Sequence, residues 1–470
     1  MVEGRKRNAR LAVLVVEANY SHAQLAAAFV RVAMENNARE FAGVTRSHVS
    51  HWVGGTRPSG RAPILLCETL SRRLGRIVTL EELGLSTEPE SPREVDWCTD
   101  TLTTLADLGS VDLDMERRRL LSTAAYSVAG LALPGESWWR GMAEQGAHRS
   151  AVGVHRVGRV DLEAVRDMVA VFSRMDQRRG GGHGRTAVVQ YLMSDVAGQL
   201  AGTFSDEQVR RGMFSAASEL AYLAGWMAFD DAEHSIAQRY FALAVKLAAE
   251  ADDAPMAGHV LRAMAHQALD LGHPRSALDL TTASVEGKRY SEATPRERAL
   301  LGVVHARSLA AGRAGQASAA ALLRAEDDLA SASPGDDEPG RAFFFQEASL
   351  AHETACSLRD TGDLRGAERE FRRSVRTRKA AMFTRTHAVT LGYLGAVQLR
   401  QGNFEEARDS WSRALDAMDG VRSGRTRRTA SDIRAGLSPF RKRGMPEALE
   451  LDARAMAYLA SPTLGARPQQ

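Results

Sequence analysis

Gly402-Asn-Phe-Glu-Glu-Ala407, followed by Trp411 and Ala414, is the clearest copy of a pattern that recurs through the second half of the chain. Further copies begin at Gly362, Gly272 and Asp231, and a degenerate copy spans 309–325. In each copy a tight turn precedes a small residue and then an aromatic or another small residue. Small residues let two helices approach closely, and the aromatic fills the space between helix pairs. Because each pair leaves an apolar face that its neighbour covers, the pattern predicts an all-α solenoid.

The composition agrees with a helical protein. Hydrophobic residues make up 44% and charged residues 25% of the 470 residues, which excludes wholesale disorder. Isoleucine occurs only four times, whereas strands are enriched in β-branched residues. The cysteines Cys67, Cys98 and Cys356 lie far apart, and we expect them to be buried small residues in a reducing compartment. No stretch reaches the roughly 18 apolar residues of a membrane span, so we predict a cytoplasmic protein without membrane contact.

The repeat pattern resembles the tetratricopeptide repeat, stretched to about 40 residues. It gives a predicted repeat domain over 187–460, preceded by a helical connector over 94–186. Within the connector we expect a helix interrupted at Gly109 and a flexible turn at Gly180-Gly-Gly-His-Gly184. The polar, proline-containing segment 86–93 is typical of a linker and separates an N-terminal domain over 1–85.

The N-terminal domain holds the basic excess of the chain. Residues 1–76 contain twelve basic and five acidic residues, a net charge of +7, whereas the whole chain has +3. Any electrostatic function is therefore expected here.

Helix signals are clear in this domain. We expect a first helix over 8–18 and a second that begins after Ser21 as its N-cap. Thr45 caps a third helix, in which Val49 and Trp52 point inward. The side chains predicted to point outward are Arg46, Ser47, Ser50 and His51. Gly54-Gly55 supplies its stop, and Pro63 opens a fourth helix that ends near Leu74.

The segment 21–58 resembles the helix-turn-helix of the XRE (Cro/repressor-like) family, with a connection about ten residues longer than usual. The resemblance implies base-reading residues on the third helix, namely Arg46, Ser47, Ser50 and His51. It also implies contacts to the DNA backbone by His22, Thr45, Arg57 and Arg61, and we expect the basic residues Arg5, Lys6 and Arg7 at the start of the chain to meet phosphates.

Nearly the whole chain resembles actinobacterial XRE-type regulators with a tetratricopeptide-like domain, the NsdA-like group of negative regulators. The resemblance implies a sequence-specific transcriptional regulator, a repressor in that group, with double-stranded DNA as its partner. We expect a homodimer, because one such helix reads few base pairs. We also expect a peptide or small-molecule effector pocket on the repeats, with aromatic candidates Tyr191, Tyr222, Trp226 and Phe344.

The competing hypothesis is a repeat scaffold that binds partner proteins through its repeats and uses the N-terminal domain only for docking. The sequence contains no GxSxG, HExxH or Walker A motif, so we predict that the chain is not an enzyme and uses no metal or cofactor.

Overall fold

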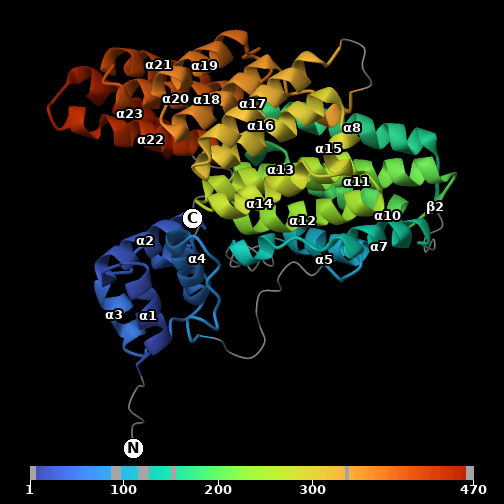
Figure 1. Ribbon diagram of the computed structural model, residues 1–470, viewed down its shortest axis with the longest axis horizontal. Helices are drawn as coiled ribbons and strands as arrows, with labels where there is room; N and C mark the ends of the chain where they lie inside the picture. The colour runs from blue at the N-terminus through green and yellow to red at the C-terminus, as the bar shows by residue number, and fades with distance from the viewer. Residues whose placement is uncertain are drawn as a thin grey trace, which may run out of the picture.

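The structure is a computed structural model that describes residues 7–36, 38–85, 97–114, 126–149, 155–333 and 338–461 (Figure 1). Helices dominate it. Within the described residues the strands are β1 Arg156–Val157 and β2 Thr203–Phe204, which form one short parallel pair. The all-α prediction is therefore confirmed. The predicted linker 86–93 and the basic residues Arg5 and Lys6 lie outside the described residues.

Residues 7–85, which we call the N-terminal unit, share one hydrophobic cluster. Its helices are α1 Ala9–Glu17, α2 His22–Glu35, the 3₁₀ turn η1 Arg39–Phe41, α3 Arg46–Val53 and α4 Ala62–Leu74. The local sequence explains their ends: Ser21 and Gln24 form a reciprocal capping box on α2, and Gly75 ends α4 with a φ of 66°. The predicted caps and boundaries of these helices are confirmed.

Aromatic packing accounts for the long connection between α2 and α3. The Phe29 ring of α2 lies 5.2 Å from the Trp52 ring of α3 and 5.6 Å from the Phe41 ring of η1. The residues of this connection thus form the end of α2 and the turn η1, whose Phe41 side chain packs against the core. Edge-to-face contacts of this kind fix the angle between the two helices.

In residues 97–461, which we call the body, the first elements are α5 Thr101–Leu113, η2 Val128–Leu131, α7 Glu136–Ala147, α8 Arg159–Arg179, η3 Gly181–His183, α9 Arg185–Tyr191, the π-helix η4 Leu192–Val196 and α10 Ala197–Leu200. The predicted interruption at Gly109 is wrong, since α5 continues through it. The glycine serves close packing instead, because a Cβ at this position would collide with Met193.

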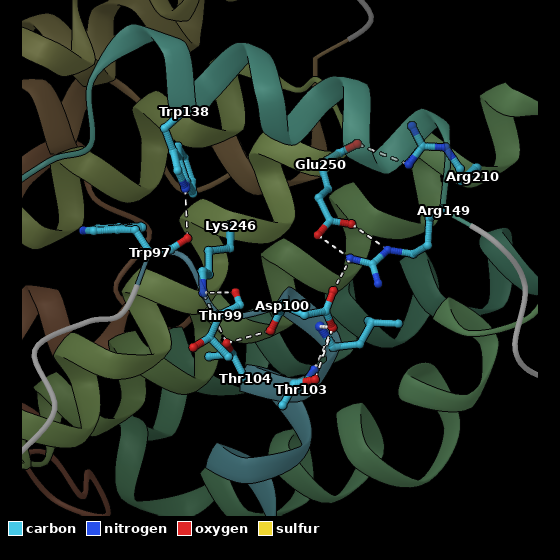
Figure 2. A network of polar contacts seen from close by, with 11 residues as sticks. Trp97, Thr99, Asp100, Thr103, Thr104, Trp138, Arg149, Arg210, Lys246 and Glu250 are labelled. Carbon is cyan, nitrogen blue, oxygen red and sulfur yellow. Dashed lines mark hydrogen bonds and ion pairs between the residues drawn. The ribbon is translucent and has the colours of Figure 1, made fainter.

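A polar network joins the start of α5 and the residues after α7 to the helix α12, His234–Glu250 (Figure 2). Arg149 donates to Glu250 at 2.7 and 3.0 Å and to Asp100 at 2.7 Å. The Lys246 ammonium donates to the Thr99 carbonyl at 2.7 Å, and the Glu250 side chain is fully buried. Buried charges of this kind are stable only when each has partners, so the network has a structural role.

Consecutive helices then pack as antiparallel pairs, which stack on one another (Figure 1). The pairs are α11 Glu207–Asp230 with α12 His234–Glu250, α13 Ala254–Asp270 with α14 Pro274–Ser284, α16 Pro295–Ala311 with α17 Gly315–Ala330, α18 Glu347–Thr361 with α19 Leu364–Thr377, α20 Thr384–Arg400 with α21 Phe404–Ala417, and α22 Gly424–Arg441 with α23 Pro446–Ala460. The short α15 Lys288–Ser291 and η5 Gly340–Ala342 lie between pairs.

One left-handed residue makes the turn inside each of the first five pairs. These residues are Ala232, Gly272, Arg313, Gly362 and Gly402, with φ between 63° and 96°. The two copies without glycine at this residue are the Asp231 copy and the degenerate one. They keep the same turn at a conformational cost.

Small residues allow close approach of the paired helices, as the pattern predicts. Gly395 of α20 lies directly against the Trp411 ring of α21, and Gly225 of α11 lies against the Phe241 ring of α12. A Cβ at either glycine would overlap the ring. Both aromatic side chains are buried, as the pattern predicts.

The helix α20, from the fifth pair, contacts α8 and α11 through buried ion pairs. Arg385 of α20 donates to both carboxylate oxygens of Asp176 in α8, at 2.9 and 3.0 Å, and lies 3.4 Å from Asp230 in α11. All three side chains are at most 2% exposed. The Gly180–Gly184 turn is part of this junction, since the Gly181 N–H donates to Asp230 at 2.9 Å. We expected a flexible turn; the structure shows a buried, hydrogen-bonded one.

A buried polar cluster joins the N-terminal unit to the body. Glu68 of α4 accepts from Arg72 at 2.8 Å and is hydrogen-bonded to His273, before α14, at 2.6 Å. The Asn36 side chain accepts from the Tyr126 N–H at 3.2 Å. Burial alone would raise the pKa of Glu68, but His273 and Arg72 outweigh it and hold that pKa below its ordinary value.

The cysteine expectation is only partly met. Cys356 is buried and Cys67 is half-buried, whereas Cys98 is exposed near the start of α5. Burial raises the pKa of Cys67 to about 12, which favours an unreactive thiol. Across the described ranges, no helix has the length and apolar character needed to cross a bilayer.

Candidate nucleic-acid interface

Helix α3 buries one face and exposes the other. Val49, Trp52 and Val53 face the core of the N-terminal unit and are at most 8% exposed. The predicted base-reading side chains lie together on the opposite face, and all of them are exposed: Arg46, Ser47, Ser50 and His51. Within the described residues, none of these four side chains makes a hydrogen bond or an ion pair.

The side chain that organises the start of α3 is His48, which sequence reasoning did not single out. Its Nδ1 accepts from the Thr45 N–H at 3.1 Å and lies 3.1 Å from the Thr45 hydroxyl. Thr45 and His48 therefore cap each other, in the way that Ser and Gln do on α2. The spacing of three residues was the available signal. Thr45 itself is exposed beside Arg46.

Arg57 and Arg61 differ from the expectation. The Arg61 guanidinium donates to the Asn36 carbonyl at 2.9 Å, and its side chain is 11% exposed. Arg57 is exposed as a residue, but it donates to the Leu85 carbonyl at 2.6 Å. Both arginines thus tie segments of the N-terminal unit together, and Arg61 is too buried to be offered freely to a phosphate.

The chain enters the N-terminal unit beside the end of α3. The Asn8 N–H donates to the carbonyl of Val53, the last residue of α3, at 3.0 Å, and the Asn8 side chain donates to Leu83 at 2.9 Å. Arg7, exposed and next to Asn8, therefore lies near the same helix. His22 is half-buried at the first position of α2. The helix α3 lies on the side of the N-terminal unit away from the body (Figure 1).

Three of the four aromatic residues proposed for an effector pocket share one cleft. Tyr222 and Trp226 of α11 and Phe344 line a cleft of about 400 Å³ between α8, α11 and η5. Tyr191 does not line it; its ring packs on Phe172 at 6.1 Å. The carboxylates that also line the cleft, Glu219 among them, were missed because they come from segments far apart in the sequence.

Within the described residues, no cluster of three or more His, Cys, Asp or Glu side chains is arranged to hold a metal ion. His352 and Cys356 are neighbours at 3.8 Å, but both are buried in the body, and burial raises the pKa of the Cys356 thiol to about 11.

The fold and the exposed face of α3 define a helical protein with a small N-terminal unit and a larger body of paired helices. Residues 11–86 match the family model described as SP15 N-terminal domain, so the match covers the N-terminal unit alone. No curated protein matches the chain.

Proposed function

We propose that this chain is a sequence-specific, DNA-binding transcriptional regulator of the cytoplasm, in which α3 is the recognition helix of an XRE-like helix-turn-helix. The observation that carries the proposal is the solvent face of α3. It presents a guanidinium, two hydroxyls and an imidazole whose hydrogen-bonding groups are unused, on a helix whose other face is fixed by Trp52 and Val49. An exposed helix of this kind fits the major groove.

Each side chain on this face has a chemical match in the groove. Arg46 can donate two hydrogen bonds to the O6 and N7 acceptors of a guanine, while Ser47, Ser50 and His51 can each make a single bond to a neighbouring base. The revised set of backbone contacts is Thr45, His22 and Arg7, because Arg57 and Arg61 are engaged within the unit. Arg5 and Lys6 complete the basic arm in the sequence.

In this proposal the body is a tetratricopeptide-like solenoid that supports homodimerisation and responds to an effector. Two recognition helices about one helical turn apart would give the specificity that one short helix lacks. Light scattering of the full chain, free and bound to DNA, tests this arrangement: we expect a dimer on DNA, and a strict monomer in both states would contradict it.

The recognition helix is tested by titrating the full chain on a duplex selected from a random pool and on an unselected duplex, by fluorescence anisotropy. We expect Arg46→Ala to cost about 1–3 kcal/mol of binding to the selected duplex and much less on the unselected one. Arg365→Ala, which removes an exposed arginine from α19, is the matched control and should change neither affinity.

An unchanged ratio of the two affinities in folded Arg46→Ala would overturn the role of α3. Weak, salt-insensitive binding of the wild-type chain to every duplex would favour the alternative, a protein-binding scaffold.

A further inference from the structure

The cleft between α8, α11 and η5 has walls of different chemistry. One wall is apolar and aromatic, with Tyr222, Trp226 and Phe344. The other lining groups carry charge: the carboxylates are Asp176, Glu219, Asp253 and Glu338, and the guanidiniums are Arg166 and Arg341. Negative charge therefore predominates in a cleft whose volume of about 400 Å³ suits a small organic molecule.

Three of the four carboxylates are already satisfied by close partners. Asp176 is bound by Arg385 through two hydrogen bonds. Asp253 accepts from the Ser215 hydroxyl at 2.7 Å and from the Met256 N–H at 2.9 Å.

Glu338 accepts from the Thr294 hydroxyl at 2.7 Å through Oε2, and its Oε1 lies 3.8 Å from the Arg296 guanidinium without a hydrogen bond. Each of these three carboxylates therefore has a hydrogen-bond partner within the protein.

Glu219 is different. Its nearest ion-pair partner among the described residues is Arg341, at 3.9 Å, and Arg341 is held more closely by Glu297 at 2.7 Å. The Glu219 side chain is 16% exposed.

Burial raises the pKa of Glu219 to about 7, with Asp253 and Glu297 adding to the rise and Arg341 and Arg166 opposing it. A cation bound close to such a carboxylate stabilises its ionised form.

The aromatic wall suits the apolar body of a ligand. The Tyr222 and Trp226 rings are inclined by 27° with centroids 6.1 Å apart, and Phe344 lines the cleft from the η5 side. The guanidiniums of Arg262 and Arg425 already lie over the Trp226 ring, at 5.7 and 6.0 Å, so the wall offers apolar area to the ligand and leaves the ammonium group to the carboxylate.

We propose that this cleft binds a small organic cation, a primary ammonium on an aromatic or aliphatic body, with Glu219 as the counter-ion of the ammonium group. An anionic ligand would meet four carboxylates against two guanidiniums, and a neutral ligand would leave Glu219 with only its 3.9 Å pairing to Arg341. The regulatory meaning of this site rests on the proposed function, since it would make this class of molecule the effector of the regulator.

The probe for the test is 2-phenylethylamine, with 2-phenylethanol as its neutral counterpart, titrated calorimetrically into the full chain at about pH 8, where Glu219 is ionised. We expect the amine to bind at least about tenfold more tightly than the alcohol. Glu219→Gln should remove that preference by about the same factor. Glu163→Gln, which removes an exposed carboxylate from α8, should leave it intact.

Equal binding of the two probes, no binding of the amine, or an equal loss in Glu163→Gln would each overturn the site. The same samples titrated on DNA separate this result from the proposed function. Amine binding with unchanged DNA affinity would support the site and remove its effector role, whereas absence of DNA binding would contradict the proposed function without touching the calorimetry.

Discussion

Arginine has opposite roles in the two parts of the molecule. Arg46 in the N-terminal unit projects from α3 into solvent, and its guanidinium makes no hydrogen bond or ion pair within the described residues. Arg385 in the body is buried and is bound by two carboxylates. The same type of side chain is exposed to solvent in one place and forms buried ion pairs within the fold in the other.

The comparison shows that net charge does not give the number of arginines that are free to bind a ligand. The +7 of residues 1–76 describes the electrostatic field of the N-terminal unit, but not the number of guanidiniums that are available to bind. Many of them donate within the unit: Arg10, Arg57, Arg61, Arg72, Arg73 and Arg76.

The largest effect on stability is expected for the buried arginine, Arg385. Arg385→Ala leaves Asp176 and Asp230 buried without their cation, so it should lower the free energy of unfolding by about 3–5 kcal/mol. Denaturant titration of the full chain measures this. Arg400→Ala, an exposed arginine at the end of the same helix, is the control, and an equal effect of the two substitutions would break the comparison.

Glu68→Gln should have the next largest effect, because it removes the negative charge that pairs with Arg72 and His273 between the N-terminal unit and the body. We expect a loss of about 2–3 kcal/mol, with the N-terminal unit becoming accessible to protease at its junction. Limited proteolysis followed by mass spectrometry checks this, with exposed Glu81→Gln as control. An intact junction in the variant would show that apolar contacts alone hold the two parts.

Arg61→Ala sharpens the comparison inside the N-terminal unit. If Arg61 behaves like an arginine of the body, its removal costs about 1–2 kcal/mol of stability through the lost bond to Asn36 and leaves the salt dependence of DNA binding nearly unchanged. Arg7→Ala should do the reverse, with little change in stability and a salt slope smaller by about one unit. Anisotropy titrations over a salt series distinguish the two variants. A smaller dependence of DNA affinity on salt in Arg61→Ala would indicate that Arg61 contacts a phosphate.

The smallest expected effect is on the thermal stability, which should depend on pH in opposite directions for the carboxylates of Glu219 and Glu68. Glu219 has a pKa raised to about 7, so above that pH the folded protein carries a cost that disappears as the pH falls toward 4.5. Glu219→Gln should therefore raise the Tm by about 1–3 °C at about pH 8 and have no effect at about pH 4.5.

Glu68 has the opposite sign. Its lowered pKa contributes stability above pH 4.5 that is lost as the pH falls through the lower folded value, so the deficit of Glu68→Gln should shrink in acid. Thermal melts over a pH series check both signs. A deficit of Glu219→Gln at about pH 8 would contradict the assignment of that carboxylate as uncompensated.

Local features were predictable from the sequence. The Ser21 cap, the inward Val49 and Trp52, and the turns and aromatic residues of the helix pairs depend on neighbours a few residues away. The outward face of α3 followed from the same periodicity.

Long-range polar pairings were not predictable. Glu68 and His273 are 205 residues apart, and neither has a local pattern that indicates the other. The cleft residue Glu219 resembles any other glutamate on a helix until η5 is placed across from it. The resemblance implied a backbone contact for Arg61, but its guanidinium donates to the carbonyl of Asn36 at the end of α2, which the sequence pattern did not indicate.

The junction of Arg385 with Asp176 has a consequence for the synthesis of the protein. The two residues are 209 positions apart, so at about 5–20 residues per second a ribosome makes the carboxylate roughly 10–40 s before its arginine. During that interval Asp176 and Asp230 lack the guanidinium that compensates them in the folded protein, so these carboxylates are stable only when they are hydrated or protonated. Completion of this junction therefore requires the synthesis of α20.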